Sequence, residues 1–119
     1  MAQKEAFAGA RVRLEQERAS LRNDIAALAA DNQAPQDDAG VGNHMADDAT
    51  EVFARERDLA LRLNAQELLA HVDAAIKRLN EGRYGICARC GQEIAPDRLE
   101  ALPYAIYCIT CQSQVEHER

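Results

Sequence analysis

Residues 61–79 read LRLNAQELLAHVDAAIKRL, and this stretch decides the fold. Apolar residues recur in it in alternating steps of four and three, at Leu61, Ala65, Leu68, Val72, Ala75 and Leu79. This spacing is typical of a coiled-coil seam. The pattern predicts a helix over about 47–81, a rod of about 50 Å. The helix is expected to stop near Gly82, because glycine can adopt the left-handed cap conformation.

A second helical pattern precedes this stretch. Over roughly 3–31, apolar residues recur every seven positions, at Phe7, Leu14, Leu21 and Leu28. Residues 32–46 contain one Pro, two Gly and two Asn, which is typical of a loop. Two amphipathic helices joined by a loop predict an antiparallel hairpin, and an intermolecular coiled coil is the alternative. Val52 and Leu59 extend an apolar stripe toward the loop in poorer register.

Composition narrows the class of protein. The chain has 119 residues, a net charge of -6, 4% aromatic residues and no Trp, which favours helices with narrow apolar seams. It contains no run of about 18 apolar residues and no signal-peptide core, so we expect a cytoplasmic protein without a membrane helix. The acidic balance argues against non-specific nucleic-acid binding. So short a chain is not expected to enclose a deep substrate pocket, and we expect no enzyme.

The four cysteines form two C-x-x-C pairs, Cys87-Ala-Arg-Cys90 and Cys108-Ile-Thr-Cys111. Each pair can place two thiolates on one side of a metal ion, and this spacing is typical of a zinc site. Gly85 and Gly91 flank the first pair and suit its tight turns. Four cysteine ligands leave no open position on the metal. The pattern therefore predicts one structural Zn²⁺.

Other uses of the four cysteines fit less well. Two disulfides would need an oxidising compartment, and a thioredoxin-like pair would need a βαβ context. An iron–sulfur cluster is the main remaining alternative. We expect residues 83–119 to be a compact C4 zinc finger ending in a short helix from about 109. Its near-neutral charge favours protein contact or a structural role over DNA reading.

The joint between the predicted helices is acidic. Seven carboxylates and no Lys or Arg lie between Arg22 and Arg55, at Asp24, Asp31, Asp37, Asp38, Asp47, Asp48 and Glu51. In a hairpin they cluster at the end remote from the cysteines, where they could enter a basic channel or approach a bound Mg²⁺. The alternative is helix capping, because Asp48 and Glu51 have capping-box spacing. We place the tip loop at about 32–49, within a hairpin domain of 1–82.

Two stretches now resemble a known family. They read NHMADDATEVF at 43–53, continuing into ERDLAL at 56–61, and YGICARCGQEI at 84–94, followed by RLEALP at 98–103. With the second cysteine pair they resemble the DksA/TraR family of bacterial transcription factors over about 43–112. The resemblance implies a coiled-coil hairpin with a C4 finger that binds RNA polymerase without specific promoter contacts. It also implies that the hairpin enters the secondary channel and alters the lifetime of the open complex.

The resemblance also assigns residues at the tip. The family pattern D-x-x-D-x-A places its second Asp at Asp47 and its Ala at Ala49, while His44 occupies the first Asp position. Asp48 lies between them. Some family members act with ppGpp through basic residues at three positions. Here those positions hold His71, Leu102 and Gln112, so we expect weak or absent ppGpp synergy.

The sequence thus predicts a mainly α protein: a long antiparallel two-helix coiled-coil hairpin, then a small C4 zinc-finger module (83–119) with a short C-terminal helix. Its predicted function is that of a monomeric DksA/TraR-like regulator of bacterial RNA polymerase. Three alternatives stay open. They are a stress-associated protein-interaction module without polymerase activity, a thiol-redox or zinc-buffering protein, and a Gre-type cleavage factor, which would lack the C4 finger.

Overall fold

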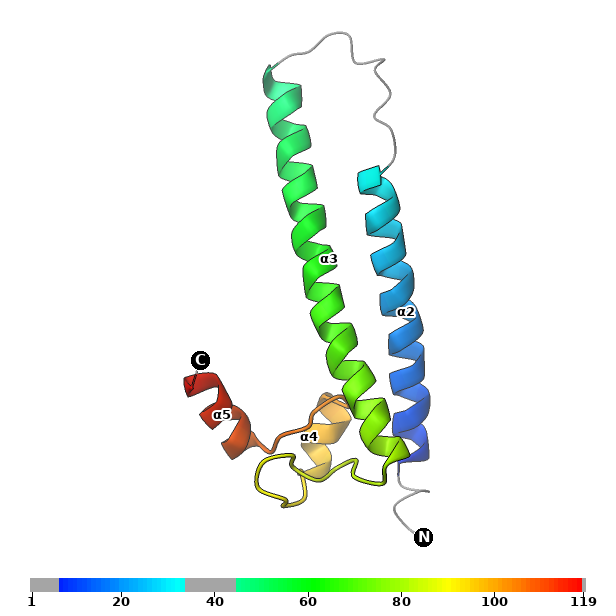
Figure 1. Ribbon diagram of the computed structural model, residues 1–119, viewed down its shortest axis with the longest axis vertical. Coiled ribbons are helices and arrows are strands. Elements are labelled where there is room, and N and C mark those ends of the chain that lie inside the picture. Colours follow the sequence, from blue (N-terminus) through cyan, green and yellow to red (C-terminus); the bar gives the residue numbers. More distant parts are fainter. Residues whose placement is uncertain (1–6, 34–44, 119) are drawn as a thin grey trace.

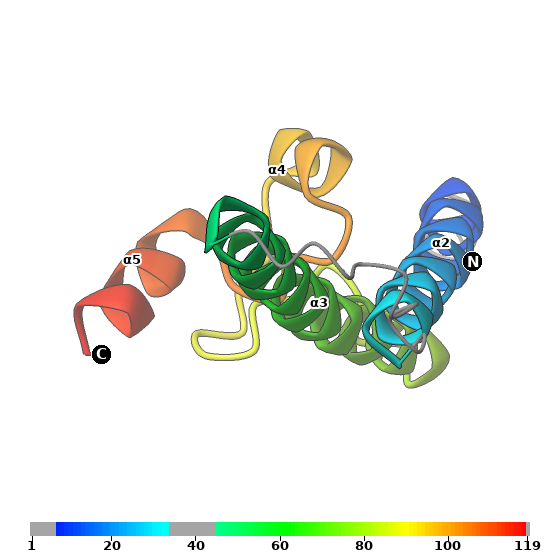
Figure 2. The same ribbon diagram turned by 90° about the horizontal axis from the view of Figure 1, so that it is seen from above.

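The computed structural model describes residues 7–33 and 45–118 of the chain. These residues form four helices: α2 (Ala8–Gln33), α3 (Met45–Asn80), α4 (Pro96–Ala101) and α5 (Ile109–His117). The two long helices run antiparallel, and the short ones lie at the base of the hairpin (Figure 1). Seen from the tip, α2 and α5 lie on opposite sides of α3 (Figure 2). The mainly α hairpin with a small C-terminal module is confirmed, and no strand forms within the described ranges.

The helix bounds differ from the expected ones at the tip. α2 reaches Gln33, and α3 already begins at Met45. Residues 47–49, expected at the end of a loop, therefore lie in the first turns of α3. The short helix α4 was not predicted, because six residues are too few to show a helical period. Its local signal is Pro96 at the first helical position, followed by Asp97 in the first turn.

The hairpin core is narrow and lies toward the base. Leu14 and Leu21 of α2 are buried, as are Val72 and Ala75 of α3. Burial decreases toward the tip, and Leu61, which was expected in the seam, is 49% exposed. The residues of α3 that are more covered at this level are Asp58, whose side chain is 21% exposed, and the half-buried Arg62. Asp58 precedes Ala65 and Val72 by seven and fourteen residues, so the side of α3 that faces α2 passes through Asp58 rather than Leu61.

The C-terminus of α3 is closed as expected. Gly82 has φ +74°, and the amide of Arg83 donates to the carbonyl oxygen of Arg78 at 2.8 Å. This six-residue closure is a Schellman motif, in which glycine adopts a conformation that side chains disfavour. The chain consequently turns sharply from α3 into the cysteine module.

An aromatic contact joins the start of α2 to the cysteine module. The rings of Phe7 and Tyr84 meet edge to face, with centroids 4.7 Å apart and planes at 82°. The Tyr84 hydroxyl donates to the carbonyl oxygen of Pro103 at 2.7 Å. Gly85 has φ +84°, and a Cβ there would lie 3.0 Å from the Phe7 ring. Only glycine therefore lets the two segments approach this closely.

Two arginines of the long helices form hydrogen bonds that hold the cysteine module on the hairpin. Arg13 of α2 donates to the carbonyl oxygen of Glu100 at 2.9 Å, at the end of α4. Arg78 of α3 donates to the carbonyl oxygens of Arg83 and Ile86. These bonds run from both long helices to the backbone of the module. Its orientation on the hairpin is therefore held from several directions.

Candidate metal centre and tip

The first cysteine pair lies on a tight backbone turn. The Gly91 amide donates to the Cys87 carbonyl oxygen at 3.0 Å, and the Cys87 amide donates to the Gln92 carbonyl oxygen at 2.7 Å. The Cys90 amide points at the Cys87 sulfur, 3.5 Å away. Gly91 has φ +75°, the conformation for which glycine was expected here. Amides directed at sulfur stabilise a thiolate in this position.

The second pair begins α5. Cys108 is the N-cap residue of that helix, and its sulfur accepts the Cys111 amide at 3.4 Å. The N-terminal end of α5 therefore faces the Cys108 sulfur. A backbone bond from the Ala88 amide to the Ile106 carbonyl oxygen, 2.8 Å long, holds the two pairs beside each other.

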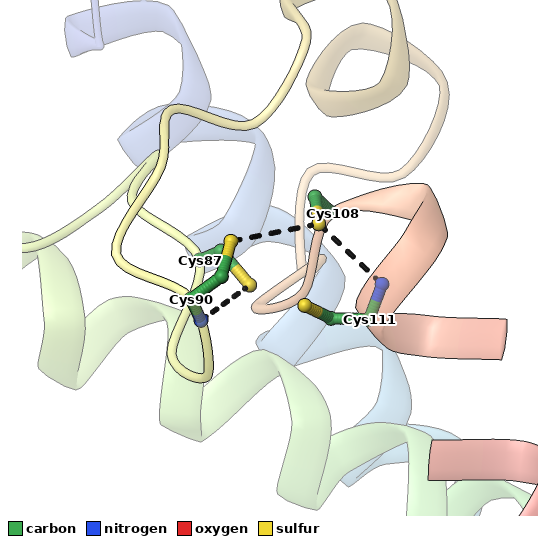
Figure 3. A group of neighbouring side chains, drawn as sticks. All are labelled: Cys87, Cys90, Cys108 and Cys111. Atoms are coloured by element: carbon green, nitrogen blue, oxygen red, sulfur yellow. Dashed lines mark hydrogen bonds between the residues drawn. The ribbon is translucent and has the colours of Figure 1, made fainter. Parts of the chain in front are cut away.

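The four sulfurs converge on one point (Figure 3). All of them lie within 4.8 Å of one another, and the Cys90 and Cys108 sulfurs are 3.8 Å apart. A zinc ion with bonds of about 2.3 Å to four sulfurs in a tetrahedron sets them about 3.8 Å apart. Cys87 and Cys111 are buried, whereas Cys90 is exposed. The donor type, the number of donors and their spacing therefore fit a zinc ion.

The thiols ionise unequally without a metal. Burial opposes ionisation of Cys87, but hydrogen bonds from neighbouring backbone amides outweigh it and lower the pKa to about 6. Burial and hydrogen bonding to the other thiols raise the pKa of Cys111 to about 12. At neutral pH the metal-free group therefore retains protons. Metal binding must release them, because the ligands are thiolates.

An ion pair joins the turn of the first cysteine pair to the C-cap residue of α5. The Arg89 guanidinium contacts the Glu118 carboxylate at 2.6 and 3.4 Å. The carboxylate raises the pKa of Arg89, first through the hydrogen bond and then through its charge. Both groups are exposed to solvent, so this pair contributes little stability. It does limit the directions that α5 can take from the metal centre.

The expected tip lies at the opposite end of the molecule. Residues 47–49 are in the first turns of α3, remote from the cysteines (Figure 1). Ala49 is exposed. The side chains of Asp47 and Asp48 lie outside the described part of the structure, and so does all of His44. The negative charge of this turn suits a helix N-terminus whatever else it contacts.

A groove at the base unites three residues that the sequence named separately. It has a volume of ≈ 480 Å³ and lies between α3 and α5, and its lining includes His71, Leu102 and Gln112. The fold, rather than any local signal, brings these three positions together. Arg98 and Glu116 also line it, so the groove carries one fixed positive and one fixed negative charge. The sequence did not indicate a groove here.

Two residues of this groove have structural partners. Arg98 donates from Nε to the Tyr107 carbonyl oxygen at 3.1 Å. His71 stacks on Tyr104, with centroids 6.2 Å apart and planes at 23°. Arg98 thus holds the connector between α4 and α5, and the histidine ring contributes a flat wall.

Known proteins resemble this chain in sequence. Residues 82–117 match the family described as "Prokaryotic dksA/traR C4-type zinc finger". The chain is 43% identical over 79 residues to "General stress protein 16O" of Bacillus subtilis, covering 48% of that protein. It is 37% identical over 71 residues to "RNA polymerase-binding transcription factor DksA" of Haemophilus influenzae, covering 49%. The chain thus spans about half the length of these two curated relatives.

The likeness to a solved structure extends over almost the whole chain. "Transcription factor DksA2" from Pseudomonas aeruginosa shares 28% identity and a TM-score of 0.71, with 99% of this chain and 86% of that one covered. No helix in the described ranges is both long enough and apolar enough to cross a membrane.

Proposed function

Because residues 82–117 belong to the prokaryotic dksA/traR C4-type zinc finger family, we propose that this chain is a DksA/TraR-like regulator of transcription. It binds bacterial RNA polymerase through the secondary channel and alters open-complex stability. The observation that carries this proposal is the likeness of nearly the whole chain to a solved DksA-type structure, hairpin and finger together. In this proposal the protein is a cytoplasmic monomer. It performs no covalent chemistry and does not bind DNA sequence-specifically.

The shape of the molecule supports insertion into a channel. Its extents are 65 × 31 × 20 Å, and the 36-residue helix α3 supplies most of the length. In the proposal, residues 1–82 are the inserted hairpin and 83–119 the finger that stays outside. Asp47, Asp48 and Ala49 form the tip that meets the active-centre region. The two carboxylates would act there through charge, by perturbing cationic groups and the hydration of Mg²⁺.

Cys87, Cys90, Cys108 and Cys111 would hold one structural Zn²⁺ in this proposal. The bound ion would supply folding energy to a module too small to fold without it. Four sulfur ligands leave no site for a substrate. Native mass spectrometry should find one zinc per chain, and a second tightly bound ion would contradict this part of the proposal.

Weak or absent ppGpp synergy is part of the same proposal. Among the described residues that line the base groove, Arg98 is the only fixed cation, and Glu116 is an opposing carboxylate. A ligand with several phosphates gains little from such a balance. We expect ppGpp to change the effect of this chain on polymerase by less than about twofold, a free energy below about 0.4 kcal/mol. A larger enhancement in a transcription assay would contradict this expectation.

Binding to polymerase is the test of the main proposal. The zinc-loaded chain, labelled at its C-terminus by a reaction that spares thiols, is titrated with bacterial core RNA polymerase. Binding at micromolar or better affinity that unlabelled DksA-type protein displaces would support the proposal. Absence of binding by a folded chain with one zinc would overturn it.

A stress-associated protein-interaction module is the second candidate. The similarity to a general stress protein favours it, as does His44 in place of the first aspartate of the tip pattern. In that case transcription should be insensitive to Asp47→Asn. Sensitivity to this change would remove the second candidate.

A further inference from the structure

The side of α3 that faces α2 can be followed from the base of the hairpin to its tip. Its covered residues recur in steps of three and four, as in a coiled-coil seam. From base to tip they are Leu79, Ile76, Val72, Leu69, Ala65, Arg62, Asp58 and Ala54, and we call them the inner line. Its base half consists of leucine, isoleucine and valine, and its tip half consists of alanine and charged residues. The side of α3 that pairs with α2 therefore changes its chemistry halfway along the hairpin.

Two polar contacts show how α2 and α3 are aligned. Arg11 of α2 donates to Asn80 Oδ1 at 2.9 Å, and the Arg18 guanidinium lies 3.9 Å from the Asp73 carboxylate. The two contacts are seven residues apart on each helix, as expected for an antiparallel pair in one register. Continued toward the tip, this register sets the charged residues of the inner line level with the last two turns of α2. Both polar contacts lie in the base half of the hairpin.

Burial decreases at the same level on both helices. Among the described residues, the hydrophobic core and the side chains packed against it extend toward the tip as far as Leu21 on α2 and Ala65 on α3. Leu21 is 6% exposed, whereas Ile25 and Leu28 in the next two turns are only half-buried. Alanine and the stems of charged side chains remove much less apolar area from water than leucine and isoleucine do. Packing therefore stabilises the base half of the hairpin more than the tip half.

The charges of the inner line weaken the pairing further. The Asp58 side chain is 21% exposed, and its ion-pair partner at 3.6 Å is Arg57 of the same helix. Arg62 has no ion-pair partner among the described residues. Within the described part of the hairpin, neither charge therefore attracts α2. Polar groups at covered positions of a coiled coil lose hydration and lower its stability.

We propose that the tip half of the hairpin, residues 22–33 and 45–65, opens and closes as one unit while the base half, residues 7–21 and 66–80, stays paired. Such partial opening is local unfolding of the least stable cooperative part of a fold. Once separated, each helical segment loses its packing, and segments of about 12 residues are marginal helices in water. Their backbone hydrogen bonds would then break. The proposed tip, residues 47–49, belongs to the half that opens, so its distance from α2 would vary.

Amide hydrogen exchange of the zinc-loaded full chain, followed by NMR at several low urea concentrations, tests the opening. Amides of residues 25–29 and 54–62 should share one protection factor, at least about a hundredfold below that of residues 14–21 and 69–76. Their protection should also depend less on urea, because opening of one half exposes less surface than global unfolding. Equal protection of the two halves would overturn the inference. Protection that falls residue by residue toward each helix end, without a shared value, would be end fraying and would overturn it too.

A variant of the inner line tests the cause of the opening. Asp58→Leu/Arg62→Leu extends its aliphatic part toward the tip and should slow exchange of residues 25–29, on the opposite helix, at least about tenfold. The higher helix propensity of leucine over aspartate accounts for only about twofold of this change. Arg55→Leu/Glu56→Leu is the matched control, because it replaces one cation and one carboxylate at exposed positions of the same half. The control should change exchange of residues 25–29 less than about twofold.

The comparison between the two variants decides the role of the inner line. If the inner-line variant slows exchange on α2 no more than the control does, its charges do not cause the opening and the inference is wrong. Sedimentation velocity checks that both variants are monomeric. Should the double variant self-associate, Arg62→Leu alone gives the same comparison. None of these outcomes involves polymerase, so the inference goes beyond the proposed function and the two can fail separately.

Discussion

Gly85 shows how one residue decides the joint between hairpin and finger. Its φ of +84° is unfavourable for any side chain, and a Cβ there would lie only 3.0 Å from the Phe7 ring. Gly82 has a similar φ of +74°, but a Cβ there would meet no atom within 4 Å. Substitution of Gly82 therefore tests backbone strain alone, whereas substitution of Gly85 tests backbone strain together with steric contact.

Gly85→Ala should destabilise the zinc-loaded chain more than Gly82→Ala. The second change costs about 1 kcal/mol of backbone strain, and the first should cost roughly 1–2 kcal/mol more, because the Phe7 ring must move. Urea unfolding followed by circular dichroism measures both values. Adding Phe7→Leu should recover part of the extra loss. Equal losses for the two alanine variants would contradict the close approach.

Tyr84 couples the same joint to pH. Burial raises the pKa of its phenol above the ordinary 10.0. The folded state therefore holds the phenol proton more tightly than the unfolded state does. The contribution of the protonated phenol to the free energy of unfolding is present below pH 10 and is lost as pH rises through the folded pKa. Tyr84→Phe removes the hydrogen bond to Pro103 and should cost about 1 kcal/mol at neutral pH.

The alkaline decline in unfolding free energy should also be shallower in Tyr84→Phe than in the parent. Denaturant titrations at neutral pH and above pH 10 give this comparison. An equally steep decline in the two proteins would mean that another group causes it.

At the scale of elements, the finger and the hairpin differ in what stabilises them. The buried hydrophobic side chains of the finger are few, namely Tyr84, Cys87, Ile94, Leu99, Ala105 and Cys111. Two of these are metal ligands in the proposal. The hairpin instead has its own seam around Leu14 and Val72. The two elements should therefore respond differently to loss of zinc.

Removing zinc with a chelator should unfold the finger and leave the hairpin largely helical. Amide hydrogen exchange should then accelerate over about 84–111, while far-UV circular dichroism loses only a minor part of its signal, because α2 and α3 hold most helical residues. Returning zinc should restore protection. Unchanged protection of these amides without metal would show that the finger does not depend on it.

The elements also show what the sequence could and could not predict. The heptad positions Leu14, Leu21 and Val72 were expected in the seam and are buried, because a local period identifies a helical face. The apolar period does not show where polar residues take the covered positions, so Leu61 was placed in the seam although Asp58 and Arg62 are the more covered residues at its level. The clustering of the four cysteine sulfurs was predictable, because C-x-x-C spacing is itself local geometry.

Contacts between segments that are distant in the chain could not be predicted from the sequence. Phe7 was expected only as a seam residue, yet it contacts Tyr84 and Gly85 in the finger. His71 and Gln112 were singled out by family resemblance, but only the fold shows that they share a groove. Such pairings depend on the three-dimensional path of the chain, which no short pattern encodes.

At the scale of the whole molecule, the proposed tip and the metal centre lie at opposite ends of a 65 Å rod. Interactions that hold the rod on a partner can be spread along its length. A charge effect on a partner's active centre is confined to the tip, because screening limits charges to about 10 Å. Affinity and regulatory effect should therefore be separable by mutation.

Asp47→Asn should reduce the effect on open-complex lifetime about tenfold and raise the Kd for polymerase less than about threefold. Asp97→Asn is the matched control, because it removes one exposed carboxylate at the base, on α4. Promoter-complex decay and equilibrium binding measure the two quantities. A parallel loss of both in Asp47→Asn would mean that the tip mainly supplies affinity.

The contact between Phe7 and Tyr84 also constrains the order in which the protein can form during synthesis. The aromatic residue near the start of the chain leaves the ribosome early, but its partner follows only after both long helices have emerged. The hairpin can pair before the cysteines are made, whereas its base would not close until the finger has bound the proposed zinc ion. The first turn of α2 is therefore among the last parts of the molecule to settle. A cell short of zinc would accumulate chains with a finished rod and an open base.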